Sequence, residues 1–432
     1  MLAAVAGIVP LATPALAQDI SEADAERAML QAQLDALQEQ IKDLSARLAK
    51  AEKATSWKGA PQQAGGGFDF KMRGRIQYDM GTASSGAQGD DKLPAADQPA
   101  FNSDFRRLIF GAAGSLPGGF KYKADFDFAG SKVNYEDVIL TWAPADSPFS
   151  VTLGNHYSFS GLETMTSSGA ITFIERSQAN EAFNHSRRLG VSAGFAQGDF
   201  MVNAGVFPDW TGSSTPNGAI PGVADDSLVI GARAVYSPKL GENQLHVGVN
   251  YQHRENDDTK HTNQYKTRPF TRVTDTRLAD TGGLTADGDA VYGAELAGVF
   301  GPLYAAGEYQ RLTVSGSNLA NRPSFSSWYV EGGYVLTGES RGYKNGAWLA
   351  PKVANPFDKG GPGAILVSAR IDQLDLNDGT VLGGKQTGYG LSMTWLPIDY
   401  VKFLAQYVRV EATKNSVDTD ADIFGLRAQV EW

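Results

Sequence analysis

Basic side chains at alternate positions are the residues of this chain whose types and spacing could do chemistry. Lys71, Arg73 and Arg75 are two residues apart, and so are Lys121 and Lys123. In a β-strand such positions share one face, about 6.8 Å apart per step. A row of cations at this spacing could bind an anion weakly and pass it from one site to the next.

Acidic residues share these faces, which leaves a second interpretation open. Asp69 and Asp79 have the parity of the first basic row, and Asp125 and Asp127 have that of the second. On the strand faces that carry the basic rows, the positive and negative charges are therefore nearly balanced. Each basic residue either binds a passing anion or forms a structural salt bridge with a neighbouring carboxylate.

The elements that must position these residues are β-strands. From residue 68 to residue 432, apolar and polar residues alternate with period two in about sixteen segments, joined by tight turns and longer polar connections in alternation. Because every backbone polar group must be paired in lipid, a sheet that spans a membrane has to close. The pattern predicts an all-β membrane protein, a 16-stranded antiparallel transmembrane β-barrel over 68–432; a soluble β protein is the alternative.

Composition excludes several classes of function. The 432 residues include no cysteine, carry a net charge of −10 and contain no long Lys/Arg block, so thiolate metal sites and a nucleic-acid partner are not expected. The five histidines form no triad pattern, and Asn155-His156 beside a serine is the one hint of catalysis. Asp418, Asp420 and Asp422 alternate in what we interpret as the last loop, with too few oxygens for a calcium site. We predict no enzyme activity, no cofactor and no metal.

The N-terminal region has three predicted parts. Residues 1–17 are apolar, end in Ala15-Leu16-Ala17 and predict a signal peptide, although no basic residue precedes the apolar core. Residues 18–53 contain a heptad of leucines and isoleucine, typical of a short α-helical coiled coil that self-associates. An amphipathic helix packed on its own chain is the alternative. Residues 54–67, which end in three glycines, predict a flexible linker.

Several ordered motifs from residue 68 onward resemble the phosphate-selective porin O and P family. The resemblance implies a sixteen-stranded, homotrimeric outer-membrane porin whose third extracellular loop enters the lumen, and it covers nearly all of 68–432. The motifs that carry it are Phe68-Asp69-Phe70-Lys71-Met72-Arg73-Gly74-Arg75-Ile76-Gln77, Asp104-Phe105-Arg106-Arg107, Phe120-Lys121-Tyr122-Lys123, Phe159-Ser160-Gly161-Leu162-Glu163, Thr166-Ser167-Ser168, Glu175-Arg176, Leu336-Thr337-Gly338-Glu339 and Gly346-Ala347-Trp348.

The resemblance also implies roles for particular residues. Arg106 and Arg107 match the family's arginine pair at the constriction, and the segment from about 157 to 187 matches the constricting loop. Adjacent residues of a regular strand point to opposite faces, so both arginines can face the pore only at an irregularity. Lys266 and Arg268, in the long connection 255–288, resemble a basic patch on a second inward loop.

Two positions depart from the family pattern. Gly169 follows Thr-Ser-Ser, and Asn155 follows Gly154, where the family often carries a basic residue. Both departures remove positive charge near the expected constriction. They count against strict selectivity for phosphate and leave the barrel prediction unchanged.

The function expected from the sequence is a passive channel for small inorganic anions, phosphate or polyphosphate, in the outer membrane of a Gram-negative cell, surrounded by outer-membrane lipid. A general, weakly selective porin is one alternative. The other is an envelope protein that tethers the outer membrane to the cell wall through peptidoglycan contact of a periplasmic coiled coil. The channel-lining residues expected are Arg106, Arg107, Lys71, Arg73, Arg75, Lys121, Lys123, Lys266 and Arg268.

Overall fold

The computed structural model describes residues 28–29, 31, 33–40, 42–43, 68–85, 100–130, 132–209, 227–256, 262–316, 319 and 322–432. The chain divides into two units between Gly66 and Gly67, and each is described by itself. In the first, residues 33–40 are α-helical, with Leu34 51% and Leu37 57% exposed. The predicted signal peptide, the linker and most of the 18–53 heptad region lie outside the described residues. No helix in the described ranges combines the length and the apolar character that a membrane crossing requires.

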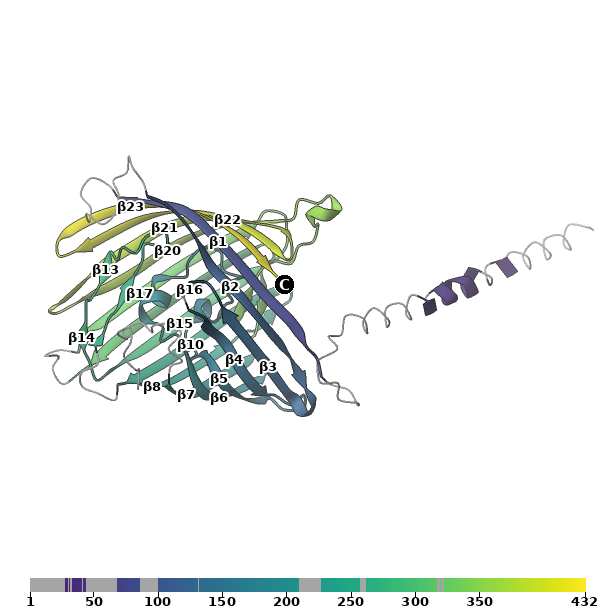
Figure 1. Ribbon diagram of the computed structural model, residues 1–432, viewed down its shortest axis with the longest axis horizontal. Helices are drawn as coiled ribbons and strands as arrows, with labels where there is room; N and C mark the ends of the chain where they lie inside the picture. The colour runs from purple at the N-terminus through teal and green to yellow at the C-terminus, as the bar shows by residue number, and fades with distance from the viewer. Residues whose placement is uncertain are drawn as a thin grey trace, which may run out of the picture. The chain divides into compact units, whose positions relative to one another are not determined.

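The second unit is a closed antiparallel barrel, shown in Figure 1. In the described part of the chain sixteen strands form its wall, as the alternation predicts, and β23 pairs with β1 to close it. The wall strands are β1 (Lys71–Ser85), β2 (Ala100–Leu116), β3 (Phe120–Asp127), β4 (Asn134–Trp142), β5 (Phe149–Tyr157), β6 (Arg187–Gln197), β7 (Phe200–Asp209), β8 (Leu228–Tyr236), β10 (Asn243–Glu255), β15 (Gly288–Phe300), β16 (Leu303–Ser315), β17 (Ser324–Val335), β20 (Ala364–Asp378), β21 (Val381–Ile398), β22 (Val401–Lys414) and β23 (Val417–Glu431).

Short elements occupy the connections between wall strands. One end of the barrel, which we call the turn end, carries η1 (Pro117–Gly119) and the tight turns 198–199, 301–302 and 399–400. The other end, the loop end, carries most of the longer connections. The remaining elements are α2 (Leu162–Met165), α3 (Gln178–Phe183), β9 (Lys239–Leu240), β11 (Thr262–Asn263), β12 (Lys266–Thr267), β13 (Ala279–Asp280), β14 (Leu284–Thr285), β18 (Gly342–Lys344), β19 (Ala347–Leu349) and η2 (Phe357–Lys359).

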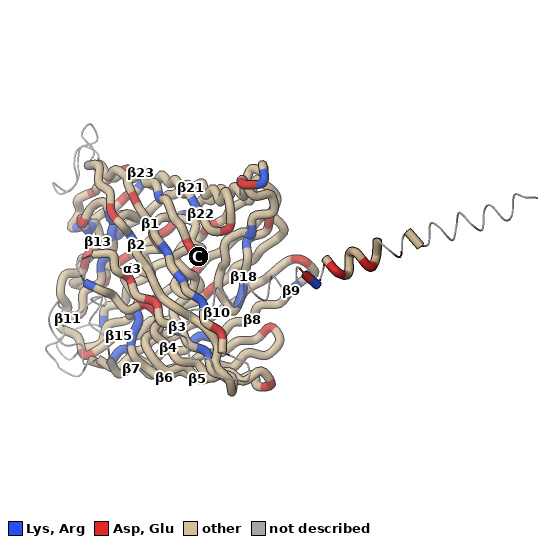
Figure 2. Tube along the Cα trace, turned by 45° about the vertical axis from the view of Figure 1, so that its right-hand side comes forward, with Lys and Arg blue, Asp and Glu red and all other residues tan. Residues whose placement is uncertain are grey.

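Side-chain burial follows the period of two. On β22, Phe403 (44% exposed) and Tyr407 (45%) face outward, whereas Lys402 and Gln406 are buried inside. Charged residues of both signs are interspersed along the wall strands (Figure 2). The apolar outer surface and the polar inner wall are those of a sheet with lipid outside and water inside.

The last hairpin corrects one prediction from the sequence. Asp418, Asp420 and Asp422 lie in β23 and not in a loop, because Asn415 and Ser416 form a tight turn with φ of 52° and 64°. Residues of this kind in the left-handed region suit a two-residue hairpin turn. Arg409 on β22 pairs with Asp420 at 2.5 Å and with Asp422 at 2.8 Å. The polar run that looked like a loop is thus the end of a hairpin.

Candidate functional site

In the part of the chain that the structure describes, three connections fold into the barrel and fill much of its interior. We call residues 158–186 L3, residues 256–287 L5 and residues 336–363 T6. L3 and L5 meet the inner faces of β15, β16, β17 and β20 in an apolar cluster around Phe183, Tyr265 and Leu312. A second cluster places Phe270 and Leu278 of L5 against β22 and β23. This side of the lumen is therefore packed with side chains of L3 and L5.

T6 enters from the turn end and packs against L3. Its β18–β19 hairpin places Trp348 in an apolar cluster with Leu162 of L3 and Tyr304 of β16. The Trp348 backbone N–H donates to Thr166 Oγ1 at 3.1 Å. Arg341 donates to the Ala170 carbonyl at 3.2 Å and pairs with Glu331 at 3.4 Å. L3 is thus supported on one side by the wall and on another by T6.

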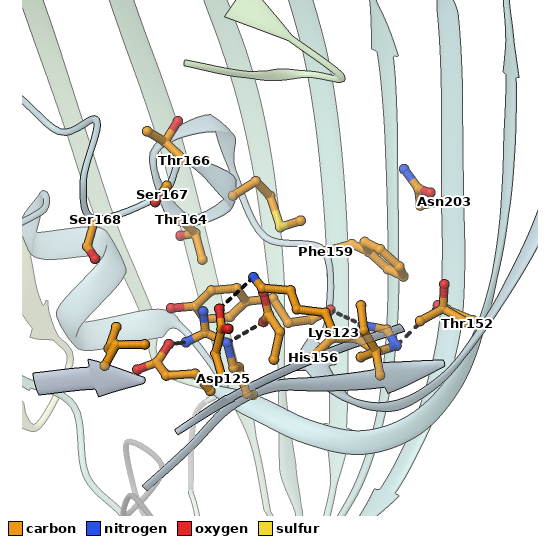
Figure 3. Close-up of a pocket in the computed structure, with 18 of the residues that line it drawn as sticks. Lys123, Asp125, Thr152, His156, Phe159, Thr164, Thr166, Ser167, Ser168 and Asn203 are labelled. Carbon is orange, nitrogen blue, oxygen red and sulfur yellow. Dashed lines mark hydrogen bonds and ion pairs between the residues drawn. The ribbon is translucent and has the colours of Figure 1, made fainter. Parts of the chain in front are cut away.

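One open space in the described part of the interior is a cavity of about 340 Å³ between L3 and strands β1 to β7. In Figure 3, Thr166, Ser167 and Ser168 of L3 lie on one side of it, and Lys123, Asp125 and His156 of the wall lie on the other. The cavity contains six cationic and three anionic side chains: Arg73, Arg75, Arg107, Lys123, Arg176 and Arg187, with Asp125, Glu136 and Asp137. Cations therefore outnumber carboxylates along its wall.

The three carboxylates of the cavity are held by part of this basic set. Arg187 pairs with Glu136 and Asp137, each at 2.6 Å. Lys123 pairs with Asp137 at 2.5 Å and with Asp125 at 3.3 Å. Arg73 lies 3.7 Å from Asp125, and Arg75 pairs with Glu431 at 2.6 Å. These cations have much of their charge compensated within the wall.

Arg107 and Arg176 differ from the other cations of the cavity. Arg107 Nη1 donates to Gln77 Oε1 at 3.0 Å. Arg176 donates from Nε to the Glu163 carbonyl at 3.0 Å and from Nη2 to the Thr166 carbonyl at 2.6 Å. Within the described ranges, neither guanidinium forms an ion pair with a carboxylate. Both guanidinium groups are held in place by neutral acceptors.

A β-bulge explains how Arg106 and Arg107 both reach the interior. Gln77 pairs with Arg107 and Tyr78 pairs with Phe105, so Arg106 is an extra residue in β2. Arg107 lines the cavity, whereas Arg106 forms a bidentate pair with Glu175 of L3, at 2.6 and 3.1 Å. The adjacent arginines therefore have different partners: one faces the open space and the other holds L3.

Charges near this bulge shift two pKa values outside the wall strands. Burial disfavours the charged form of Glu175, but Arg106 outweighs it and holds the pKa of Glu175 well below its usual range. Repulsion from Arg106, together with burial, lowers the pKa of Arg272 in L5 to about 10. The guanidinium of Arg272 lies 3.9 Å from Glu175, and its side chain is 45% exposed.

Gly169 has a structural reason at its position. A Cβ there would lie 2.1 Å from Glu431 Oε2 and 3.0 Å from Arg75 Nη2. Arg75 uses the same space to donate to Ser167 Oγ and Ser168 Oγ, at 2.8 and 2.7 Å. Arg75, which binds the hydroxyl groups of Ser167 and Ser168, occupies the space beside Gly169 where the family often carries a basic side chain.

Lys402 and Asn155 are both buried, on different strands of the wall. Lys402 Nζ on β22 donates to the carbonyls of Gly169 and Ile171, at 2.8 and 3.1 Å. Asn155, 1% exposed, donates from Nδ2 to the Glu136 carbonyl at 2.6 Å. Lys402 is a buried basic residue of β22 that binds L3, and the sequence does not single it out, because only the folded loop brings position 402 to position 169.

The structure places the predicted residues in separate groups. Arg73, Arg75, Arg107 and Lys123 line the cavity, and Arg106 binds L3. Lys71 and Lys121 are exposed and do not line the cavity. In L5, Lys266 donates to Gln264 Oε1 at 2.9 Å, and Arg268 pairs with Glu181 of α3 at 2.6 Å.

Two cavity residues, Arg176 and Arg187, were missed as candidates. Arg187 belongs to a second Arg-Arg pair, at the start of β6, and that pair was the available signal. Arg176 lies in the Glu175-Arg176 motif, but nothing in the motif indicates which way its side chain points.

Comparison with known proteins agrees with the barrel and with the motifs on L3 and T6. The family profile described as phosphate-selective porin O and P matches residues 70–432. The chain belongs to this family. Members of the family are channels, so this chain is an outer-membrane porin.

Relatives and solved structures agree with the family assignment. Porin O of Pseudomonas aeruginosa is 28% identical over 408 residues, covering 84% of this chain and 88% of that protein. An uncharacterized protein of Caulobacter vibrioides is 34% identical over 368 residues, covering 84% of this chain and 72% of the other.

Among solved structures, the outer-membrane channel DcaP of Acinetobacter baumannii has a TM-score of 0.54 at 12% identity, covering 86% of this chain and all of the other. An anion-selective porin from Comamonas acidovorans has a TM-score of 0.52 at 11% identity, covering 84% of this chain and all of the other. At these identities the likeness shows a shared fold.

Proposed function

We propose that this porin conducts small inorganic anions, phosphate among them, through the cavity between L3 and β1 to β7. The observation that carries the proposal is the presence of two guanidinium groups, those of Arg107 and Arg176, without a carboxylate partner in the described part of the chain. A cation about 4 Å from an anion contributes roughly 4 kcal/mol at an effective dielectric of about 20. These two groups replace part of the hydration energy that an anion loses when it enters the cavity.

The remaining cations support passage without trapping. Arg73, Lys123 and Arg187 are already bound to carboxylates, so each can offer a passing anion only part of its charge. Sites of moderate strength in series favour conduction, because an anion must leave each site as readily as it enters. Arginine also offers a fork of donors that matches two oxygens of a phosphate. Strong selectivity for phosphate over chloride would require the paired hydrogen bonds of the guanidinium group as well as its charge.

The test is ion selectivity in planar bilayers. We expect Arg107→Gln and Arg176→Gln each to decrease the anion-to-cation permeability ratio by about tenfold, the effect of about 1.4 kcal/mol. Lys121→Gln is the matched control, because Lys121 is exposed and lies outside the cavity. Reversal potentials that do not change in the two arginine variants would refute the proposed pathway.

A general, weakly selective porin is the second candidate. The pairing of most cavity cations with carboxylates favours it. The two candidates differ in one measurement, the inhibition of chloride current by phosphate. A phosphate-binding channel shows saturable inhibition that Arg107→Lys weakens, because lysine keeps the charge and loses the fork. A general porin shows no saturable inhibition of chloride current by phosphate.

We also propose that the protein is a homotrimer. The exposed leucines of the helix at 33–40 and the predicted heptad over 18–53 support self-association. One solved structure of similar fold, OmpT of Vibrio cholerae, has a trimer form, with a TM-score of 0.50.

Deleting residues 18–56 tests whether this region also tethers the barrel to peptidoglycan. If conductance survives while attachment to peptidoglycan is lost, the tether function is supported.

A further inference from the structure

T6 has a second branch on the outside of the barrel, separate from the hairpin in the lumen. Residues 350–363, which we call the finger, project from the turn end as the yellow-green segment beside β22 in Figure 1. In a porin the short turns face the periplasm, so the finger lies at the periplasmic end. Its tip is η2, where Phe357 is 61% exposed.

The finger is bonded to itself and to the wall. The Gly361 N–H donates to the Pro356 carbonyl at 3.0 Å, and the Gly363 N–H donates to the Asn355 carbonyl at 2.9 Å. The Val353 N–H donates to Asp399 Oδ1 at 2.8 Å. These bonds hold the tip in a fixed place, so the exposure of Phe357 is a property of the fold.

Phe357 continues a row of aromatic rings on the lipid-facing wall. Its ring meets Trp395 edge to face with centroids 5.9 Å apart, and Trp395 stacks on Phe403 at 5.6 Å. Trp395 Nε1 donates to the Pro362 carbonyl at 2.9 Å, which ties the indole to the finger. Tyr400, 61% exposed, lies in the adjacent turn. Aromatic rings of this kind settle where acyl chains meet headgroups.

Charged residues flank Phe357 in the sequence of the finger. Lys352 and Lys359 are exposed on the finger, and Asp358 is their one acidic neighbour within it. An apolar ring between basic side chains suits a surface that offers acyl chains and phosphate groups together. A water-exposed loop would gain nothing from holding a phenylalanine in this position.

We infer that the finger is a membrane anchor that docks on the phospholipid of the periplasmic leaflet, with Phe357 inserted at the headgroup–acyl boundary and Lys352 and Lys359 at the phosphates. The inference follows from the fold and is independent of ion selectivity. It also gives T6 two attachments, because its other branch holds Thr166 of L3 through Trp348. T6, which packs against L3 beside the cavity, is thereby fixed to the membrane surface.

Site-directed spin labelling tests the inference, and the absence of cysteine from the chain makes single labels unambiguous. The full-length porin carrying Phe357→Cys is labelled and placed in vesicles of phosphatidylethanolamine and phosphatidylglycerol. Collision rates with oxygen, which concentrates in lipid, and with a water-soluble nickel chelate report the position of the label. The control is Asn345→Cys, an exposed residue at the β18–β19 turn.

We expect a severalfold higher ratio of oxygen to nickel collisions at position 357 than at position 345. Equal ratios would place the finger in water and overturn the inference. A label that neither reagent reaches would indicate a contact between subunits and would overturn it as well. Retention of heat-modifiable gel mobility shows that each labelled barrel is folded, and Lys359→Cys, expected to give a ratio between the two, provides a second position.

Discussion

Arg106 and Glu175 join the wall to L3 through two parallel hydrogen bonds, of 2.6 and 3.1 Å, at the one register shift between β1 and β2. Both side chains are mostly buried, with 12% and 17% of their surface exposed. The bulge turns Arg106 inward and leaves Arg107 facing the cavity. The arginine pair therefore divides into a residue that positions L3 and a residue that meets the solute.

Arg106→Gln should loosen L3 more than Glu175→Gln does. The first change leaves the buried carboxylate with only the more distant guanidinium of Arg272, 3.9 Å away, at a cost of about 3 kcal/mol, whereas the second leaves an arginine that Asp79 and Asp127 still attract. Open-channel current noise and the urea midpoint of the folded barrel measure the difference. Equal changes in noise and urea midpoint in the two variants would contradict the positioning role. A loss of ion selectivity in Arg106→Gln without increased current noise would contradict it as well.

The Arg106–Glu175 pair should resist acid. Because the folded-state pKa of Glu175 is lowered, its contribution to stability is complete above the unfolded value of about 4.3 and is lost only as pH falls through the lower, folded value. We expect current noise to stay constant from about pH 8 to about pH 5 and to rise under stronger acid. The Glu175→Gln variant is the control, since it has no carboxyl group to titrate at this position.

Gly169→Lys tests the departure from the family pattern. The new side chain would meet Glu431 Oε2 first, at the flexible end of a side chain that can move. We expect the lysine to pair with Glu431 and to release Arg75, so that the cavity gains an uncompensated cation. The anion-to-cation permeability ratio should rise severalfold, whereas Gly169→Ala, which displaces Glu431 without adding a charge, should change it much less. A ratio that falls in Gly169→Lys would show that Arg75 is needed in its present place.

Strand parity predicted the fold and part of the site. It placed Arg73, Arg75 and Lys123 on the inner wall, where they line the cavity, because period-two alternation is set locally by the strand. It could not separate these residues from Lys71 and Lys121, which share the parity but lie outside the cavity. The position of L3 decides which part of a strand faces open space.

The contacts of L3 lie beyond what local pattern can reveal. Arg176 is fixed by carbonyls of its own loop, and Gly169 is bonded by Lys402, which is 233 positions away in the sequence. Phe183 and Leu312 likewise meet in an apolar cluster inside a lumen whose wall the sequence predicts to be polar. These pairings depend on the path of L3, L5 and T6, and a single sequence shows only that the connections are long.

Lys402 supplies the last test of how L3 is held. Lys402 is 3% exposed, and its Nζ donates to two L3 carbonyls; hydrogen bonds of charged groups contribute about 1.5 to 3 kcal/mol each. Lys402→Met keeps the volume and removes both donors, so amide hydrogen exchange around 169–171 should accelerate while the wall strands keep their protection. Lys402→Arg, which keeps the charge and the donors, should restore slow exchange in part. Unchanged exchange in Lys402→Met would show that Arg75 and the T6 contacts suffice to hold L3.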